Sequence, residues 1–328
     1  MICGIMAGRQ KRIVFLWHNG GRLANQLWPY MSIYAYCLER GYRLENHCFF
    51  EYARHFNLRP NNRAIELLYY RTHDFLKRHF SKVFFRDPHD NLFRKLYKVY
   101  VKLVEKLCRK QVIYAPMEPV PKIQYLPPTP DASPEVLAQE AAPHRTVYFH
   151  GWLFRNPVGL GKYRKEIVAA FGPKPEVAAS IGRKMSELRS RYRKVIGVHI
   201  RQGDYRGDPD AAKHCFSAEE VNAALGEYVA KFGVDTATTA FLICSDETID
   251  LAKFPGLHVS QPGRSYMEDL FLLAACDLII GSNSTFGPIA AYYGNIPFIT
   301  LRKGGVDWEY YRGQDRFFFD KYATLVYY

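Results

Sequence analysis

The sequence lacks the features of a membrane-spanning or secreted protein. No stretch approaches about 18 consecutive apolar residues, which is the length that a transmembrane helix needs. Residues 1–8 are too few for the apolar region of a signal peptide, and basic residues follow them directly. We therefore expect a cytoplasmic protein without a transmembrane anchor, whose only approach to a membrane is a peripheral contact at its inner face.

Paired cysteines are also missing. The seven cysteines stand singly, no CxxC pair occurs, and their number is odd. These features argue against a disulfide framework and against a structural zinc site, and they are typical of a reducing compartment. The chain has no internal repeat and no low-complexity tract, and the GxGxxG fingerprint of dinucleotide-binding proteins is absent.

Acidic residues are in the minority. Lysine and arginine number 45 against 32 acidic residues, and the formal net charge is +13. Such a charge favours an anionic partner: a nucleotide diphosphate, a nucleic acid or an anionic membrane. Two basic stretches, residues 71–86 and 94–110, have two interpretations, as solvated helix faces or as a surface for an anionic membrane or a glycolipid acceptor. Because no nucleic-acid-binding module is recognisable, we expect no nucleic-acid partner.

The remaining composition is that of an ordinary globular protein. The chain has 328 residues, of which 48% are hydrophobic and 23% charged, enough for one large or two medium domains. An apolar run predicts a strand over Arg12–His18, and a Gly-Gly turn then leads to a helix over Leu23–Arg40 that ends at Gly41. Residues 51–110 predict two or three helices, and the proline-rich residues 115–143 predict an extended connection.

From residue 146 onward, strands and helices alternate. Strands are predicted at 146–150, 194–200, 240–244, 257–259, 277–281 and 296–301. Helices are predicted at 162–170, 175–192, 217–231, 247–253, 265–276 and 285–293. Ser265 and Glu268 have the spacing of a capping box. The alternation is typical of an α/β protein whose parallel sheet is covered by helices on both faces.

The strongest chemical signal is His199–Tyr205, with the sequence HIRQGDY, where a buried strand runs into a loop. Ligands of open α/β sheets bind outside the carboxyl ends of the strands. His199 and Arg201 would share one face of the strand, and a guanidinium can hold a diphosphate with two hydrogen bonds. Gly203 permits a tight turn, and Asp204 can orient Arg201 or accept a hydrogen bond from a substrate hydroxyl. A salt-bridged strand end is the structural alternative.

Two further segments have small and polar residues where a helix begins after a strand. Gly281–Gly287, with the sequence GSNSTFG, would offer unpaired N–H groups and the positive end of a helix dipole to a phosphate. Its simpler interpretation is an N-cap at Asn283 or Ser284. Gly20–Leu27, with the sequence GGRLANQL, is again a glycine turn at a helix start, with a plain strand–helix connection as the alternative.

Two further chemical roles, a metal site and a catalytic base, have candidate residues between Asp204 and His214. Asp208-Pro209-Asp210 forms a DxD string, and a metal ion can stabilise the leaving group in transferases. Such short strings are common by chance, and this one lies in a Gly-Asp-Pro loop, so we expect no metal. The base for an acceptor hydroxyl has three candidates, Asp204, Asp208 and His214, among which the sequence does not choose.

Taken in their order along the chain, the sequence motifs resemble those of the fucosyltransferase superfamily, and most closely those of its α-1,2 branch. The branch shows GGxGNQ, HxRxGDY, S-D-[DE] and a late D-L-x-L-M-x-x-C…N-S-[ST]-F pattern. The matching segments here are residues 21–26, 199–205, 245–247, 269–276 and 283–286. The resemblance therefore covers most of the chain.

The resemblance implies the GT-B fold, in which two Rossmann-like domains with parallel sheets face a cleft. We place the acceptor-side domain at 1–160 and the GDP-sugar-binding domain at 161–328. The resemblance also implies inversion at the anomeric carbon without a metal or other cofactor, with GDP-fucose as the donor substrate.

The resemblance assigns roles to matching residues. It implies donor contacts by His199, Arg201, Asp269, Asn283, Ser284, Thr285 and Phe286. It implies that Arg22, Asn25 and Gln26 face the sugar and the acceptor. We assign Arg201 and Asp204 to catalysis.

The sequence thus predicts a GDP-fucose-dependent glycosyltransferase that acts on a glycan or glycolipid, with the 2-OH of a galactoside as the acceptor position. Two alternatives stay open: a transferase for a different GDP-linked sugar, and a non-catalytic protein that binds a nucleotide sugar or a glycan. The intact Arg201 and Asn283–Phe286 argue against a dead site.

Overall fold

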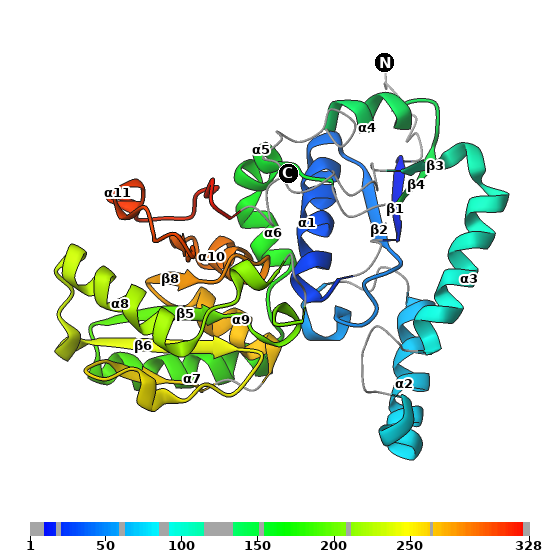
Figure 1. Cartoon of the computed structure of the whole chain (residues 1–328). Helices are drawn as coiled ribbons and strands as arrows, with labels where there is room; N and C mark the ends of the chain where they lie inside the picture. Colours follow the sequence, from blue (N-terminus) through cyan, green and yellow to red (C-terminus); the bar gives the residue numbers. More distant parts are fainter. Residues whose placement is uncertain are drawn as a thin grey trace. The chain divides into compact units, whose positions relative to one another are not determined.

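The chain folds into two compact units, residues 1–172 and 173–327, in a computed structural model (Figure 1). The structure describes residues 10–17, 21–58, 63–84, 92–114, 134–150, 154–207, 211–262 and 265–323. We expected the second domain to begin at residue 161. The two compact units divide after Gly172, and Phe171 belongs to the first of them, where its ring packs edge-on against Tyr30 and Tyr34 with ring centroids 4.7 and 5.4 Å apart.

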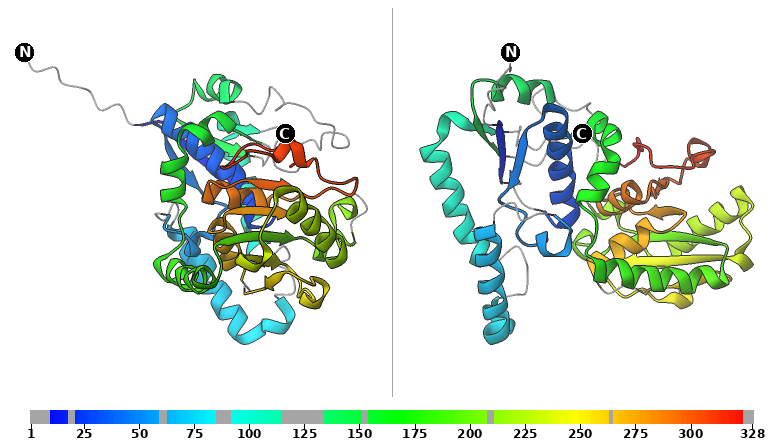
Figure 2. Two further views of the ribbon diagram at one scale, coloured as in Figure 1. Left: turned by 90° about the vertical axis from the view of Figure 1, so that its left-hand side faces the viewer. Right: turned by 180° about the vertical axis from the view of Figure 1, so that it is seen from behind.

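The first unit is built on a four-stranded parallel sheet in the order β2-β1-β4-β3. The strands are β1 (Arg12–Trp17), β2 (Arg43–Asn46), β3 (Val112–Tyr114) and β4 (Thr146–His150). The helices are α1 (Leu23–Arg40), η1 (Ala53–His55), α2 (Arg63–Phe84), α3 (Leu92–Leu107), η3 (Arg109–Gln111), α4 (Pro134–Ala141), α5 (Pro157–Lys162) and α6 (Arg164–Ala170). Helices α1 and α3 lie on opposite faces of this sheet (Figures 1 and 2).

The core of the first unit is rich in aromatic side chains, which bury a large apolar area each. Phe15 of β1 packs against Phe149 of β4, and Phe149 packs in turn against Phe154. Trp28 and Tyr36 of α1 are fully buried. The strand and helix predicted before and after the Gly-Gly turn are confirmed as β1 and α1.

The second unit contains a five-stranded parallel sheet in the order β7-β6-β5-β8-β9. The strands are β5 (Lys194–Ile200), β6 (Thr239–Ser245), β7 (His258–Ser260), β8 (Leu278–Gly281) and β9 (Phe298–Thr300). The helices are α7 (Pro175–Arg191), η5 (Gly203–Tyr205), η6 (Ala212–His214), α8 (Ala218–Phe232), η7 (Thr236–Thr238), η8 (Leu251–Lys253), α9 (Tyr266–Ala274), α10 (Phe286–Gly294) and α11 (Trp308–Tyr311). From β5 the chain moves outward to β6 and β7, and then returns to the other side of β5 as β8 and β9.

Helices cover both faces of the second sheet, as predicted. On one face, Leu225 of α8 and Trp308 of α11 share a buried apolar cluster with Val198 of β5. On the other face, α9 packs so closely that a Cβ atom at Gly197 would lie 2.8 Å from Leu273. The sheet is therefore buried on both sides, which explains why its strands are continuous apolar runs rather than alternating ones.

Some local predictions were wrong. Residues 134–141, inside the predicted extended connection, form helix α4, because Pro134 takes the first helical position and Leu137 and Ala141 are buried. Residues 115–133 of that connection lie outside the described residues. The helix predicted at 247–253 is only the 3₁₀ turn η8.

The helix start at Ser265 differs in detail from the prediction. The Ser265 hydroxyl does cap α9, since it accepts a hydrogen bond from Met267 N at 3.3 Å. Glu268 does not complete a capping box, because its carboxylate accepts from the Ser180 hydroxyl and pairs with Lys184 Nζ at 2.9 Å. It ties α9 to α7 instead.

Two properties expected from composition can be compared with the described residues. Within them, no helix combines the length and apolar character needed to cross a membrane. The six cysteines that the structure describes are all free thiols.

Candidate functional site

The candidate site of the second unit lies where the chain path reverses, at the carboxyl ends of β5 and β8. These strands are neighbours, with His199 opposite Gly281. The loops that follow are tied together, because Ser282 N donates to His199 O at 2.9 Å and Arg201 N donates to the Ser282 hydroxyl at 3.1 Å. In open α/β sheets, a crevice for ligands forms at such a switch point. The structure thus brings together the two segments that the sequence singled out.

Arg201 is held in place by Asp246, which follows β6. Arg201 Nη1 lies 3.2 Å from Asp246 Oδ2, and Asp246 Oδ1 accepts a hydrogen bond from Gln202 N at 3.0 Å. The guanidinium also lies over the Tyr205 ring, 5.7 Å from its centroid. A cation fixed on two sides loses little conformational entropy when it meets an anion. The pair makes Arg201 a pre-oriented cation at the strand end.

Asp246 explains why residue 203 is a glycine. A Cβ atom at Gly203 would lie 2.6 Å from Asp246 Oδ2, which no ordinary contact allows. The sequence predicted a tight turn at Gly203 and left two roles open for Asp204, to orient Arg201 or to accept from a substrate hydroxyl; the side chain of Asp204 lies outside the described residues. The orienting carboxylate described in the structure is Asp246, which the sequence placed in a motif without a role. Its position just after the strand predicted at 240–244 was the available signal.

Three candidate residues cannot be positioned. The side chain of Asp204 and residues 208–210, including Asp208 and Asp210, lie outside the described part of the structure. His214 is described: it is half-buried, and burial, followed by the charge of Lys213, lowers the pKa of its imidazole. The choice of a catalytic base among Asp204, Asp208 and His214 stays open.

His199 is buried and uncharged at neutral pH. Its ring stacks on Phe286 with the centroids 5.4 Å apart and the planes 27° apart. Burial, together with the neighbouring charge of Arg201, lowers the pKa of His199 to about 3. No described residue forms a hydrogen bond with its Nδ1. A base with so low a pKa is a poor proton acceptor at neutral pH, so His199 fits a binding role better than a catalytic one.

Asp269 is the second buried polar group without a full set of partners. It lies on α9 behind β6, where its backbone oxygen is 3.8 Å from the thiol of Cys244, the residue paired with His199 in the sheet. No described group bonds to its Oδ1. Burial raises the pKa of Asp269 to about 6. The nearest lysine, Lys184, pairs with Glu268 instead.

The start of α10 faces the same edge of the sheet. The Ser284 hydroxyl accepts from Phe286 N at 3.2 Å, and the carbonyl of Asn283 accepts from the Tyr205 hydroxyl at 3.2 Å. Asn283 and Ser284 are buried, and Thr285 is the N-cap of the helix without a side-chain capping bond. The N-cap predicted at Asn283 or Ser284 is thus Thr285, and the Ser284 hydroxyl bonds to the first N–H of the helix from the position before the cap. Phe286 N is bonded to Ser284 and Pro288 has no N–H, so Gly287 N is the backbone donor of these first three helical positions that could still meet a phosphate, at the positive end of the helix dipole.

The candidate segment of the first unit begins at the carboxyl end of β1. Gly21 has φ +87°, and a Cβ atom there would lie 2.5 Å from Asn25 Cβ, so only glycine fits. Gln26 is fully buried, and its amide donates to Gly21 O at 3.2 Å and to Glu51 at 3.4 Å. Arg94 of α3 completes this network with a two-point pair to Glu51. Gln26 is thus mainly structural, whereas Arg22 is exposed and Asn25 half-exposed.

One residue of this region was missed by the sequence reasoning. His150 ends β4, the neighbour of β1, and its Nε2 lies 3.3 Å from Glu105 of α3. Burial lowers the pKa of its imidazole. The available signal was its place at the end of the strand predicted at 146–150.

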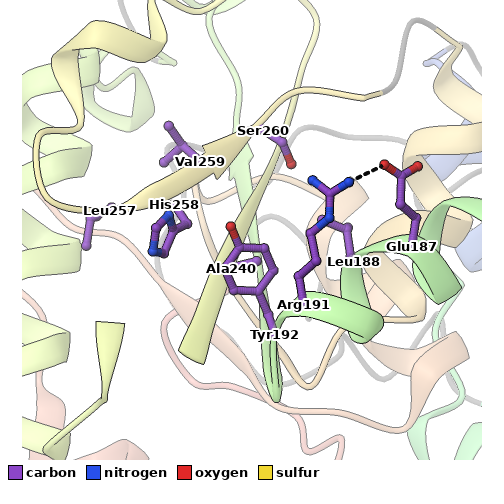
Figure 3. Close-up of a pocket in the computed structure, with 9 residues that line it drawn as sticks. All are labelled: Glu187, Leu188, Arg191, Tyr192, Ala240, Leu257, His258, Val259 and Ser260. Atoms are coloured by element: carbon purple, nitrogen blue, oxygen red, sulfur yellow. Dashed lines mark hydrogen bonds and ion pairs between the residues drawn. The ribbon is translucent and has the colours of Figure 1, made fainter. Parts of the chain in front are cut away.

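A pocket of about 410 Å³ lies elsewhere in the second unit (Figure 3). It is lined by Glu187, Leu188, Arg191, Tyr192, Ala240, Leu257, His258, Val259 and Ser260. Ala240 and His258 are near the amino ends of β6 and β7, whereas Arg201 and Asp246 follow the carboxyl ends. This pocket is therefore separate from the candidate site. Among the described residues, no group of three or more His, Cys, Asp or Glu side chains is arranged to hold a metal ion.

Two parallel sheets with Rossmann-like connections, one in each unit, define the GT-B architecture of glycosyltransferases. The sequence profile described as Glycosyl transferase family 11 matches residues 140–304. The chain belongs to this family, which is a family of fucosyltransferases. No curated protein sequence matches the chain.

Solved structures of fucosyltransferases are similar to this chain. A mutant of Arabidopsis thaliana FUT1 in complex with GDP has a TM-score of 0.52 and 14% identity, and the match covers 90% of this chain and 72% of that one. POFUT1 in complex with GDP-fucose has a TM-score of 0.48, 12% identity and coverage of 90% and 99%. The α-1,6-fucosyltransferase NodZ soaked with GDP-fucose has a TM-score of 0.48, 15% identity and coverage of 91% and 97%. The likeness to FUT1 shows the shared fold.

Proposed function

We propose that this protein transfers fucose from GDP-fucose to a glycan hydroxyl with inversion at the anomeric carbon, and that the 2-OH of a galactoside is the acceptor position. The observation that carries the proposal is the convergence at the carboxyl ends of β5, β6 and β8. An oriented arginine and a helix start lie there beside two buried polar groups that lack partners. Membership of family 11 and the GDP held by the FUT1 structure support it.

The two unpartnered groups suit a guanine base. Leaving a buried polar group without a hydrogen bond costs about 1–3 kcal/mol, so a ligand that satisfies it is bound more tightly. The Watson–Crick edge of guanine carries two adjacent N–H donors, and the Asp269 carboxylate can accept a hydrogen bond from each. Uracil and adenine do not present two such donors side by side. His199 offers Nδ1 as a further polar atom. We infer that these residues select the base of the donor.

The diphosphate would be held by Arg201 and by the first turn of α10. When the sugar leaves, negative charge grows on the β-phosphate, and a donor already aimed at that oxygen lowers the barrier. Asp246 keeps the Arg201 side chain in its orientation, so it acts as a positioning residue. Asn283, Ser284, Thr285 and Phe286 supply the backbone and hydroxyl groups of this helix start.

The acceptor side of the proposal rests on Arg22 and Asn25. Both follow β1 at the start of α1 and are accessible, whereas Gln26 is buried in the Glu51 network. Arg22 and Asn25 can bond to hydroxyls of the sugar or the acceptor. Gln26 would act indirectly, by fixing the turn that presents them.

The decisive experiment is turnover of GDP-fucose against a panel of soluble galactosides, with the linkage and the anomeric configuration of the product read by NMR. An α-1,2-linked product from the β-linked donor sugar is the expected result. Transfer from GDP-mannose but not from GDP-fucose would point to a different GDP-linked sugar. Stabilisation by GDP without turnover on any acceptor would point to a non-catalytic binding protein, and stabilisation by UDP alone would contradict the guanine site.

A further inference from the structure

Helix α3 has three distinct faces. One face packs on the first sheet through Tyr97 and Val101, and Tyr97 donates from its hydroxyl to Leu16 O at 2.6 Å. A second face consists of large apolar side chains that are between 54% and 72% exposed: Leu96, Val99, Leu103 and Leu107. The third face consists of exposed lysines: Lys95, Lys98, Lys102 and Lys106. We call the second and third faces together the α3 ridge.

The spacing of these residues makes the ridge continuous. The apolar residues follow one another at intervals of three or four residues, so they share one side of the helix. The span from Leu96 to Leu107 is about 16 Å at 1.5 Å per residue. Each lysine directly precedes an apolar residue in the chain, which sets the lysine row about 100° around the helix from the apolar row. A band of charge therefore runs beside a band of exposed apolar surface.

We propose that the α3 ridge docks the protein on the surface of an anionic phospholipid membrane. An amphipathic helix with an apolar row and a basic row lies in the membrane interface, where the apolar side chains enter the headgroup boundary and the cations meet lipid phosphates. Exposed apolar surface of this kind marks an interaction site. The proposal depends only on the first unit, and it is independent of the donor chemistry proposed for the second.

Charge complementarity selects a membrane over a second copy of the chain. The acidic residue of α3, Glu105, is turned toward the sheet, with its carboxylate 3.3 Å from His150 Nε2 at the end of β4. None of the four ridge lysines forms an ion pair with another described residue. A partner copy docking through the same helix would bring lysines toward lysines without acidic groups to balance them. An anionic bilayer supplies the missing charge.

The base of the helix is rigid, which suits docking. Arg94 makes its two-point pair with Glu51 below the ridge, and Glu51 also accepts from Gln26 at the start of α1. Tyr97 is fixed on β1. A helix held this firmly presents its exposed rows without having to fold on binding, which lowers the entropy cost of association.

The test is co-flotation of the full chain with vesicles of phosphatidylcholine alone or with phosphatidylglycerol as the minority lipid, at about 0.1 M salt. The wild-type protein is expected to float only with the anionic vesicles. Lys95→Gln with Lys102→Gln should lower the partition coefficient roughly 25-fold, since each lysine near an anionic surface contributes about fivefold. Leu96→Ser with Leu103→Ser should lower it by roughly tenfold or more for each leucine.

The matched control variants carry the same kinds of substitution at exposed residues outside the α3 ridge. Lys165→Gln with Lys231→Gln removes the same charge from α6 and α8, and Val158→Ser removes an exposed apolar residue from α5. These controls should float like the wild type. All variants should keep their GDP affinity and melting temperature, so a failure here is distinguishable from a failure of the proposed activity.

Three results would overturn the proposal. The first is wild-type protein that does not float, or that floats equally with neutral vesicles. The second is ridge variants that float as well as the wild type, or controls that lose as much as the ridge variants. The third is a dimer in sedimentation that Leu96→Ser with Leu103→Ser dissociates, without vesicle binding, which would assign the ridge to a second copy.

Discussion

Each of the two sheets has a buried acidic residue near the carboxyl ends of its strands, Glu51 in the first unit and Asp269 in the second, and the surroundings of these two residues differ. After β1, the buried charge of Glu51 is neutralised by Arg94, and Gln26 donates to Glu51, although the Oε1 atom of Gln26 has no described partner. At the second sheet, Asp269 and His199 are equally buried but each has an atom without a described partner. A neutralised network stabilises a fold, whereas incomplete buried groups cost stability unless a ligand completes them. The contrast lies in the acidic groups: Glu51 is neutralised by an arginine, whereas Asp269 has no described ion-pair partner, and this contrast supports the proposed recognition of the donor base at the second sheet.

The largest expected effect comes from removing the oriented cation. Arg201→Ala should lower turnover by about a hundredfold or more, because a lost donor to developing charge typically costs about 3 kcal/mol. The variant should stay folded, since Arg201 is partly exposed. Turnover and circular dichroism measure the two outcomes, with Arg183→Ala on the exposed side of α7 as the matched control. A loss below about tenfold, or about 1.4 kcal/mol, would contradict the role.

Asp246→Asn tests the orientation of Arg201 by changing its ion-pair partner. The amide keeps the shape of the side chain but loses the charge that orients the guanidinium 3.2 Å away. We expect a lower kcat with a smaller loss than for Arg201→Ala. If Asp246→Asn cost as much as Arg201→Ala, Asp246 would have to act directly on the substrate rather than as a positioning residue.

The unpartnered carboxylate provides a test by pH. Asp269→Asn should weaken GDP binding about tenfold to hundredfold, the value of a buried hydrogen-bond partner at 1–3 kcal/mol. In the wild type, GDP affinity should fall as the pH drops through the pKa of Asp269, about 6, because the protonated acid no longer accepts two N–H donors. Calorimetric titration of GDP from pH 5 to pH 8 measures this. A flat profile in the wild type would remove Asp269 from base recognition.

Without GDP, Asp269 should affect folding stability with the opposite pH dependence: its contribution decreases as the pH rises. A carboxyl group whose pKa is raised in the folded state favours folding while it is protonated, and this contribution is lost as the pH rises through about 6. Relative to the wild type, Asp269→Asn should therefore gain free energy of unfolding between about pH 4 and pH 7. Urea unfolding at the two pH values measures the difference. If Asp269→Asn were less stable than the wild type by the same amount at both pH values, the Asp269 carboxylate would have hydrogen-bond partners in the folded protein.

The features of the fold and the site that could be predicted from the sequence are those formed by residues close together in the chain. The β1–turn–α1 unit follows from local sequence, since the apolar run, the glycine turn and Gly41 lie within one short segment. Helix α4 does not follow from the proline content, because proline is common both in extended chain and at the first position of a helix, which Pro134 occupies here. The Arg201–Asp246 pair joins residues from two strands, and strand order is not written in local sequence.

A smaller and more selective effect is expected after β1. Asn25→Ala should lower turnover while leaving GDP affinity within about twofold, because GDP lacks the sugar and acceptor groups that Asn25 is proposed to meet. Gln139→Ala on the exposed side of α4 is the matched control. Calorimetry with GDP beside turnover separates binding from chemistry. If Asn25→Ala lost GDP binding as severely as Arg201→Ala while remaining folded, the proposed division between the two sheets would be wrong.

The smallest effect is expected from metal removal. Arg201, held by Asp246, and the positive end of the α10 dipole can supply the positive field that a metal ion supplies in other transferases. Activity in EDTA should therefore stay within about twofold of the untreated enzyme, a change of less than about 0.5 kcal/mol. Activity lost in EDTA and restored by Mn²⁺ would contradict this and would make Asp208 and Asp210 the first residues to test as ligands. In that case Asp208→Asn should abolish the response to Mn²⁺, and the stabilisation of the leaving GDP would be shared between the metal and Arg201 rather than carried by the protein alone.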